Sequence, residues 1–370
     1  MNLNTGGWAS RVLTPLLRIV RSSPNATVPV VVISEPVNSE TAALVNADLA
    51  LVAKGTGATL AAVPDGTTAG GNKRGQYATD LQKSRSAATN VASGNYSTIL
   101  GGANNTASSS HSFIGGGQGN TAQTSTHATV AGGSANTASG QYAFVGGGDG
   151  NTASGSSSVI AGGRSCSTTV AGSDGFIGGG LSNSTAENAA VVCGGQNNTA
   201  NGAYSAILGG RYATTRSITG YHVFAACSAP IAFAQGRTQS ALLLLGRETT
   251  DATATVLTSD TNAASTTNQV ILPNNSAYSF SGEVIAGVTG AGNTARWTIN
   301  GAIKRGAGAG TTAMVGTPTV TMTHNDAGAS GWIVNVTADT TNGGIKVQVT
   351  GAASTTIRWV AKINTTEMTF

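Results

Sequence analysis

The chain has 370 residues, of which 52 are glycine, 9% are charged and 5% are aromatic, and its formal net charge is +4. So few charges exclude a solvated disordered tail, and the glycines lack the every-third spacing of collagen. Only one basic residue, Arg164, lies between positions 95 and 210. A nucleic-acid partner is therefore not expected, because such proteins gather basic residues on one face. Abundant Gly, Thr, Val and Ile instead predict an all-β fold of short strands and tight corners.

Residues 1–90 are the least regular part of the sequence. Val28–Ile33 and Leu49–Val52 are expected to be short strands, and Val12–Val20 permits an amphipathic helix. Charged residues and a proline interrupt the only apolar stretch near the start, so no secretory signal is expected. No window reaches the roughly 18 apolar residues that span a bilayer. We therefore expect no signal-dependent export and no membrane insertion.

A repeat dominates residues 91–220. A Gly-Gly pair recurs eight times, from Gly101 to Gly209, at intervals of 15 to 17 residues. Asn followed by Thr or Ser comes four residues after most of these pairs. Two residues before each pair the side chain is always β-branched, and this column is predicted to be the core of the repeat: Ile99, Ile114, Val130, Val145, Ile160, Ile177, Val192 and Ile207.

The repeat predicts a parallel β-solenoid of about eight 15-residue coils, stacked ~4.8 Å apart. Strand side chains alternate with period two, so the residues between the core positions face outward. That outward column contains Phe113, Phe144 and Phe176 and carries no charge. Because the interior is thin and the outward column is apolar, we expect sister copies to cover one another in a closed cyclic assembly.

Two histidines occupy the same column of successive coils, His111 and His127, between Tyr96 and Tyr142. Neutral imidazole is a good metal ligand, so the pair could bind a metal or an anion. The simpler interpretation is a polar-aromatic column at an interface between chains. The three cysteines match neither a disulfide framework nor a metal-ligand spacing, and no cofactor is expected: Cys166, Cys193 and Cys227.

The segment from Ser93 to Ala107 contains Ser-Gly-x-Tyr-Ser-x-Ile-x-Gly-Gly-x-x-Asn-Thr-Ala, and part of this pattern returns from Gly202 to Gly210. It resembles the head repeats of trimeric autotransporter adhesins and their relatives in bacteriophage tail fibres. The segment before it and the ending around Arg358 to Glu367 are similar to phage fibre proteins. Periodicity alone fixes neither the hand of the coil nor the number of chains.

The resemblance implies a homotrimer with a left-handed β-roll at residues 91–220. It also implies that residues 1–90 attach to a phage tail or baseplate protein. The protein would then be part of the virion after synthesis in the host cytoplasm. Its C-terminal domain would bind a host cell-surface glycan or lipopolysaccharide.

Residues 221–260 are predicted to be a neck, in which the apolar run Ala241–Leu245 is a buried strand. Residues 261–370 contain seven or more alternating runs bounded by Gly, Asn or Pro, which predict a jelly-roll-like β-sandwich. Three tryptophans of this domain are expected to fill its core. The alternative is that at least one is a receptor contact that offers a flat face to a sugar: Trp297, Trp332 and Trp359.

Three functions compete. The first is a structural phage tail fibre that presents a receptor-binding tip. The second is a fragment of a bacterial trimeric surface adhesin, which needs a signal peptide and a C-terminal anchor of lipid-facing strands. Phe370 suits such an anchor, but Lys362, Asn364 and Glu367 spoil the alternation.

The third function is a tailspike polysaccharide depolymerase, which needs two carboxylates at a set separation. The acids of the last domain, Glu283, Asp326 and Asp339, form no recognisable arrangement in the sequence. We therefore expect no enzyme and no catalytic residues. The repeat region offers three acids, each in a different coil and none paired in a column: Asp149, Asp174 and Glu187.

Overall fold

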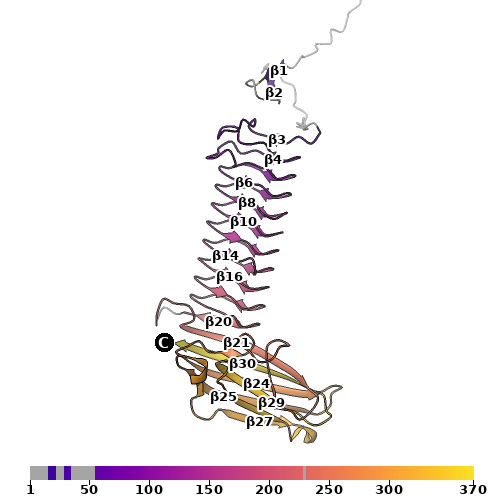
Figure 1. Ribbon diagram of the computed structural model, residues 1–370, viewed down its shortest axis with the longest axis vertical. Coiled ribbons are helices and arrows are strands. Elements are labelled where there is room, and N and C mark those ends of the chain that lie inside the picture. The colour runs from indigo at the N-terminus through magenta and orange to yellow at the C-terminus, as the bar shows by residue number, and fades with distance from the viewer. Residues whose placement is uncertain (1–15, 22–28, 35–54, 228–230) are drawn as a thin grey trace, which may run out of the picture.

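The computed structural model describes residues 16–21, 29–34, 55–227 and 231–370, and the architecture is all-β, as predicted. Stacked coils form a rod that leads into a wider domain, whose long strands cross the rod axis obliquely (Figure 1). We call these parts the rod (residues 55–227) and the tip (residues 231–370). Within the described ranges, no helix has the length and apolar character needed to cross a bilayer.

Two strands near the N-terminus form a separate antiparallel pair, β1 (Leu16–Arg21) with β2 (Pro29–Ser34). β2 matches the strand expected at Val28–Ile33. The helix considered for Val12–Val20 is wrong where the structure describes it, because Leu16–Arg21 is extended and hydrogen-bonded to β2. The strand expected at Leu49–Val52 lies outside the described residues.

The rod is a parallel β-solenoid with three ladders of very short strands. In the first ladder each strand pairs in register with the next coil, so that Ile99 lies beside Ile114 and Ile114 beside Val130. The third ladder consists of isolated bridges between successive coils. The first ladder contains β3 (Thr59–Leu60), β4 (Thr79–Asp80), β5 (Thr98–Ile99), β7 (Phe113–Ile114), β9 (Thr129–Val130), β11 (Phe144–Val145), β13 (Val159–Ile160), β15 (Phe176–Ile177), β17 (Val191–Val192), β19 (Ala206–Ile207) and β20 (His222–Ala226). The second contains β6 (Thr106–Ala107), β8 (Thr121–Ala122), β10 (Thr137–Ala138), β12 (Thr152–Ala153), β14 (Ser167–Thr168), β16 (Ser184–Thr185) and β18 (Thr199–Ala200).

The eight β-branched residues of the repeat core are all fully buried. The solenoid is longer than predicted, because its first ladder has eleven strands and starts at Thr59, ahead of the expected boundary at residue 90. The sequence pattern does not reveal the early coils, because Asp80 occupies the position beside Ile99 where later coils have Ile or Val. Asp80 is fully buried and pairs with Arg74 at 2.8 Å and Arg85 at 3.4 Å. Because a buried carboxylate needs such partners, this coil closes the apolar interior, as a capping repeat does.

A column of buried asparagines ties the coils together. The Nδ2 of Asn120 donates to the carbonyl oxygens of Gly116 in its own coil and Gly133 in the next, both at 2.9 Å. Its Oδ1 accepts the backbone N–H of Asn136 at 2.9 Å. The column thus satisfies backbone groups that the corners leave buried. Equivalent bonds are made by Asn105, Asn136, Asn151, Asn183 and Asn198.

The second glycine of each pair is required by the close approach of the next coil. Gly133 has φ +87°, and a Cβ there would lie 2.3 Å from the carbonyl oxygen of Gly148. Gly132, its neighbour in the pair, has nothing within 4 Å of the same position. The two glycines of a pair therefore play different roles in the corner.

The tip has two sheets with the tryptophans in its core. The larger sheet is antiparallel in the order β21-β30-β24-β25-β27, and β26 also pairs with β25. Its members are β21 (Thr238–Thr249), β24 (Ser276–Val288), β25 (Thr294–Arg305), β26 (Ala313–Met314), β27 (Thr319–Asn325) and β30 (Ile357–Thr369). The smaller sheet contains β22 (Thr255–Val256), β23 (Val270–Ile271), β28 (Ile333–Asp339) and β29 (Gly344–Thr350), and two 3-10 turns lie at Ala309–Thr311 and Ala327–Ala329.

The rod and the tip share one sheet, which corrects the prediction of a separate neck at residues 221–260. β20 pairs in parallel with β19 of the last coil and antiparallel with β21, which pairs along its length with β30. The run Ala241–Leu245 lies within β21 and alternates between the core and solvent. Leu243 and Leu245 are buried, whereas Leu244 is 54% exposed.

Candidate functional site

The three tryptophans lie inside the tip. Trp297, Trp332 and Trp359 are 3%, 4% and 1% exposed. The ring centroid of Trp359 is 5.7 Å from each of the other two, and its Nε1 donates to the Oγ1 of Thr249 at 2.9 Å. They fill the core, as the first interpretation expected. The alternative role as receptor contacts is corrected, because none of them presents an accessible ring face in this chain.

The three acids of the repeat region, Asp149, Asp174 and Glu187, stand in different columns of the rod. Asp149 belongs to the bridge ladder, whereas Asp174 stands at the positive-φ corner of its coil. Glu187 lies two residues before Ala189, which stands at the equivalent corner of the next coil. A glycosidase needs two carboxylates that face one substrate, and these three residues do not pair within one column.

The acids of the tip are engaged in local structure. Glu283 accepts hydrogen bonds from Arg296 at 3.0 Å and Lys362 at 3.2 Å, and these bonds lower its pKa. Burial opposes ionisation of Asp339, but hydrogen bonds from Asn342 and Thr341 outweigh it and lower its pKa. A general acid for glycan cleavage needs the opposite shift.

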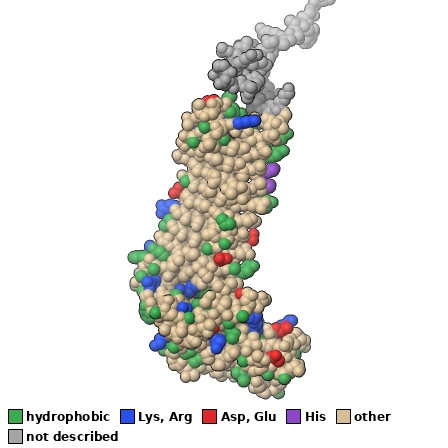
Figure 2. Space-filling model, in the orientation of Figure 1, with side chains coloured by type: hydrophobic (Ala, Val, Ile, Leu, Met, Phe, Trp, Pro, Cys, Tyr) green, Lys and Arg blue, Asp and Glu red, His purple; other side chains and the backbone are tan. Residues whose placement is uncertain are grey.

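Five aromatic rings from successive coils stack along one flank of the rod: Tyr77, Tyr96, His111, His127 and Tyr142. Their centroids are 4.8 to 5.0 Å apart, and the two imidazole planes differ by 7°. Histidine side chains are visible on this flank, while most of the rod surface carries no charge (Figure 2). All five residues have φ between 56° and 64°, a region that bulky side chains disfavour. Stacking in the usual aromatic range offsets part of that strain.

This aromatic column confirms that the two histidines share a column between tyrosines, which sequence analysis expected. The tyrosine rings are about half exposed, at 47%, 51% and 55% for Tyr77, Tyr96 and Tyr142. Because the ring faces cover one another, their polar edges are the accessible part. Among the residues that the structure describes, no three His, Cys, Asp or Glu side chains gather as a metal site. One chain therefore offers two imidazoles here, fewer than a metal ion usually takes.

A second stripe of outward-facing residues follows the first ladder. Phe144 and Phe176 are 37% and 38% exposed, and Leu100 and Leu208, each one residue after a core position, are 49% and 54% exposed. This apolar stripe is the surface that sequence analysis expected a sister chain to cover.

A buried polar cluster joins the last coil to the tip. Arg216 pairs with Glu367 of β30 at 2.8 Å, and the Nε2 of Gln239 donates to the same carboxylate at 2.9 Å. The hydroxyl of Tyr221 also donates to Glu367, and that of Thr365 donates at 2.9 Å. Sequence analysis missed this cluster. The sequence feature that could have predicted the cluster is Glu367, an acid at a core-facing position of an alternating strand.

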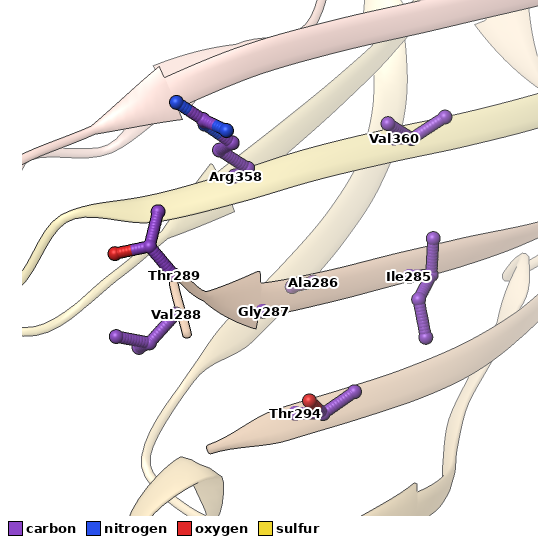
Figure 3. Close-up of a pocket in the computed structure, with 8 residues that line it drawn as sticks. All are labelled: Ile285, Ala286, Gly287, Val288, Thr289, Thr294, Arg358 and Val360. Carbon is purple, nitrogen blue, oxygen red and sulfur yellow. The ribbon is translucent and has the colours of Figure 1, made fainter. Parts of the chain in front are cut away.

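The outer face of the large tip sheet carries a shallow pocket of about 220 Å³ (Figure 3). Ile285 of β24 and Val360 of β30 are cross-strand neighbours in it, 45% and 46% exposed. Arg358 lines the same pocket and pairs with Glu248 at 3.0 Å. An apolar surface with a charged rim suits contact with another molecule, and no carboxylate, thiol or imidazole is among the residues that line the pocket.

No family model matches the chain, and no curated protein matches it. Among solved structures, the chain is similar to the tailspike protein of Acinetobacter baumannii phage AM24, with 10% identity over 81% of this chain and 55% of that chain and a TM-score of 0.19. It is also similar to the tailspike protein of Acinetobacter phage vB_ApiP_P1, with 9% identity over 80% of this chain and 55% of that chain and a TM-score of 0.19. The alignments span about half the length of these tailspikes.

Proposed function

We propose that this chain is a structural, non-enzymatic fibre of a bacteriophage tail. Residues 1–90 attach it to a tail or baseplate protein, and the tip binds a glycan or lipopolysaccharide of the host surface. The observation that carries the proposal is the unbroken sheet from β19 through β20 to β21 and β30. A tip joined in this way is held in a fixed orientation at the end of a rod, which suits a protein that presents a binding surface at a distance. The resemblance of the repeat to fibre proteins supports the same function.

The fibre is a homotrimer in this proposal. The apolar stripe with Phe144 and Phe176 and the aromatic column both lie exposed on a single chain. Contiguous exposed apolar surface is typical of protein–protein interfaces, and a closed ring of three copies would bury it. Light scattering of the purified protein should give the mass of three chains, and crosslinking should stop at the trimer. A monomer at micromolar concentration would contradict this part of the proposal.

The absence of enzymatic activity is also part of the proposal. It is supported by the placement of Asp149, Asp174 and Glu187 in three different columns of the rod and by the lowered pKa values of Glu283 and Asp339 in the tip. Purified protein incubated with host capsule or lipopolysaccharide should release no new reducing ends. Release that depends on the intact fold would favour the depolymerase instead.

The attachment function is tested on virions and on cells. Mass spectrometry of purified virions should find this chain, and an excess of soluble protein should slow adsorption of the phage to its host. Heat-denatured protein is the matched control and should not compete. If the chain is missing from virions and native protein leaves adsorption unchanged, the proposed function is wrong.

A further inference from the structure

A larger pocket, of about 460 Å³, lies where the last coil meets the tip. Asn201 and Arg216 come from the end of the rod, Thr267 and Pro273 from the segment before β24, and Arg305 from the end of β25. The volume is within the range of small-molecule sites, roughly 300–1,000 Å³. No acidic residue lines this pocket. We call it the junction pocket.

Arg305 gives the junction pocket an unbalanced positive charge. Its Nη1 donates to two carbonyl oxygens, those of Leu272 at 2.5 Å and Gly343 at 3.4 Å. Its Nε is buried and has no hydrogen-bond partner, and no carboxylate of the described residues forms an ion pair with it. A guanidinium without a carboxylate partner, beside a pocket without acids, leaves a positive charge that an anionic ligand could balance. A guanidinium selects carboxylate and phosphate groups through its planar set of donors.

The other cation of the pocket is already balanced. Arg216 uses its Nε for Glu367 and its Nη2 for the carbonyl oxygen of Gly236, both at 2.8 Å. Arg216 therefore forms part of the pocket wall, and its charge is already balanced by Glu367.

The remaining wall offers neutral donors and an apolar flank. The Oδ1 of Asn201 accepts the backbone N–H of Ser217 at 2.9 Å, which leaves its amide nitrogen available as a donor. Thr266 and Thr267 add exposed hydroxyl-bearing side chains, and Pro273 adds apolar surface. One guanidinium without a carboxylate partner, several neutral polar groups and an apolar flank are complementary to a sugar ring that carries an anionic substituent.

We propose that the junction pocket binds one sugar unit that carries a carboxylate or phosphate group, with Arg305 as the residue that recognises the anion. The inference rests on the proposed function for the source of the sugar, which is the polysaccharide of the host surface. It deepens that function, because it places recognition at the rod–tip junction rather than on the outer face of the tip sheet.

The experiment measures binding of four soluble probes to the full chain by calorimetry and saturation-transfer NMR. Glucuronate tests the carboxylate arm, glucose 6-phosphate tests the phosphate arm, glucose tests the neutral ring, and inorganic phosphate tests the anion alone. At least one of the two sugar anions should bind more tightly than glucose and inorganic phosphate. The affinity should fall as salt rises, since salt screens the attraction.

Three variants assign the site. Arg305→Gln should weaken binding of the sugar anion by about tenfold or more, as expected for the loss of a charged hydrogen bond. Lys304→Gln removes the same charge one residue earlier, on the opposite face of β25, and should change binding less than about twofold. Thr266→Trp fills the pocket from an exposed position and should abolish binding. Thermal unfolding shows whether Arg305→Gln perturbs the fold, and Thr266→Trp tests the site independently of that variant.

Equal binding of glucose and the two sugar anions, or wild-type affinity in both Arg305→Gln and Thr266→Trp, would overturn the proposal. So would a lack of saturable binding by either sugar anion. Adsorption of the protein to host cells is measured in parallel. If the protein binds host cells but neither sugar anion binds at the junction pocket, the inference fails and the proposed function stands. If the native protein binds no host cells, the function itself fails.

Discussion

The Oδ1 of Asn151 accepts the backbone N–H of Cys166 at 2.9 Å, and Cys166 has no side-chain amide with which to repeat the bond in the next coil. The asparagine column is therefore interrupted between Asn151 and Asn183. The sulfur of Cys166 approaches the carbonyl oxygen of Gly180 only to 3.7 Å. Every other member of the column from Asn105 to Asn198 donates to two carbonyls and accepts one N–H, so Cys166 marks the weakest corner of the rod.

Cys166→Asn should stabilise the rod. The side chain is fully buried in the position that asparagine occupies elsewhere, and two or three added hydrogen bonds contribute ~0.5–1.5 kcal/mol each. We expect the free energy of unfolding to rise by about 1–3 kcal/mol, measured by denaturant titration. Cys193→Ser, at an exposed cysteine, is the control and should leave the midpoint unchanged. A lower midpoint for Cys166→Asn would show that the corner cannot take the amide.

The two glycines of one pair should respond differently to the same substitution. Gly133→Ala places a Cβ 2.3 Å from the carbonyl oxygen of Gly148, at a φ of +87°. Coils must separate to relieve that contact, so we expect a loss of several kcal/mol or a failure to fold. Gly132→Ala meets open space and should change stability by less than about 1 kcal/mol. Similar unfolding midpoints for the two variants would contradict the packing of the corners.

The periodic part of the fold could be predicted because each coil repeats the same physical constraints. The columns of Ile99, Asn105 and Gly102 each require one kind of side chain, and six to eight copies of it make the pattern visible in a single sequence. Burial, amide pairing and close approach of the corners then follow from where these residues stand. The aromatic column was partly visible for the same reason, through Tyr96 and His111.

The remainder depends on contacts that are distant in sequence. Asp80 can replace Ile or Val in the core column because Arg74 and Arg85 neutralise its charge. The periodicity of the sequence does not reveal this replacement. β21 was assigned to a neck because its partner β30 lies more than a hundred residues later. The burial of the tryptophans was expected, but the joining of Arg216 to Glu367 and the junction pocket required the three-dimensional arrangement.

Glu367→Gln should weaken the joint between rod and tip. It removes the carboxylate that balances Arg216, whose side chain is 9% exposed, and leaves an unpaired buried charge. Such losses cost about 3–5 kcal/mol, which thermal unfolding and protease sensitivity at the junction would record. Glu248→Gln removes one partner of an exposed pair on the same sheet, where Arg358 is 69% exposed, and should cost less than about 1 kcal/mol. Equal effects would mean that the cluster does not hold the two parts together.

Alkaline pH should destabilise the same joint. Burial raises the pKa of Tyr221 well above its ordinary value of 10.0, and the nearby Glu367 carboxylate raises it further. The protonated tyrosine is therefore favoured in the folded chain, while the unfolded chain ionises near pH 10. The stabilisation is complete below that pH and declines as pH rises, by about 1.4 kcal/mol per unit for each such tyrosine.

Denaturant titrations from pH 8 to about pH 11.5 measure that slope, and Tyr221→Phe tests its origin. The variant loses the hydrogen bonds of Tyr221 to Glu367 and Thr365, so it should be less stable at neutral pH yet fall less steeply above pH 10. Tyr204→Phe alters a tyrosine that is 61% exposed on the rod and should keep the wild-type slope. An unchanged slope in Tyr221→Phe would assign the alkaline sensitivity to Tyr278, whose pKa burial also raises. Because both rings approach the Arg216–Glu367 pair, either result places the pH-sensitive step at the joint that fixes the tip on the rod.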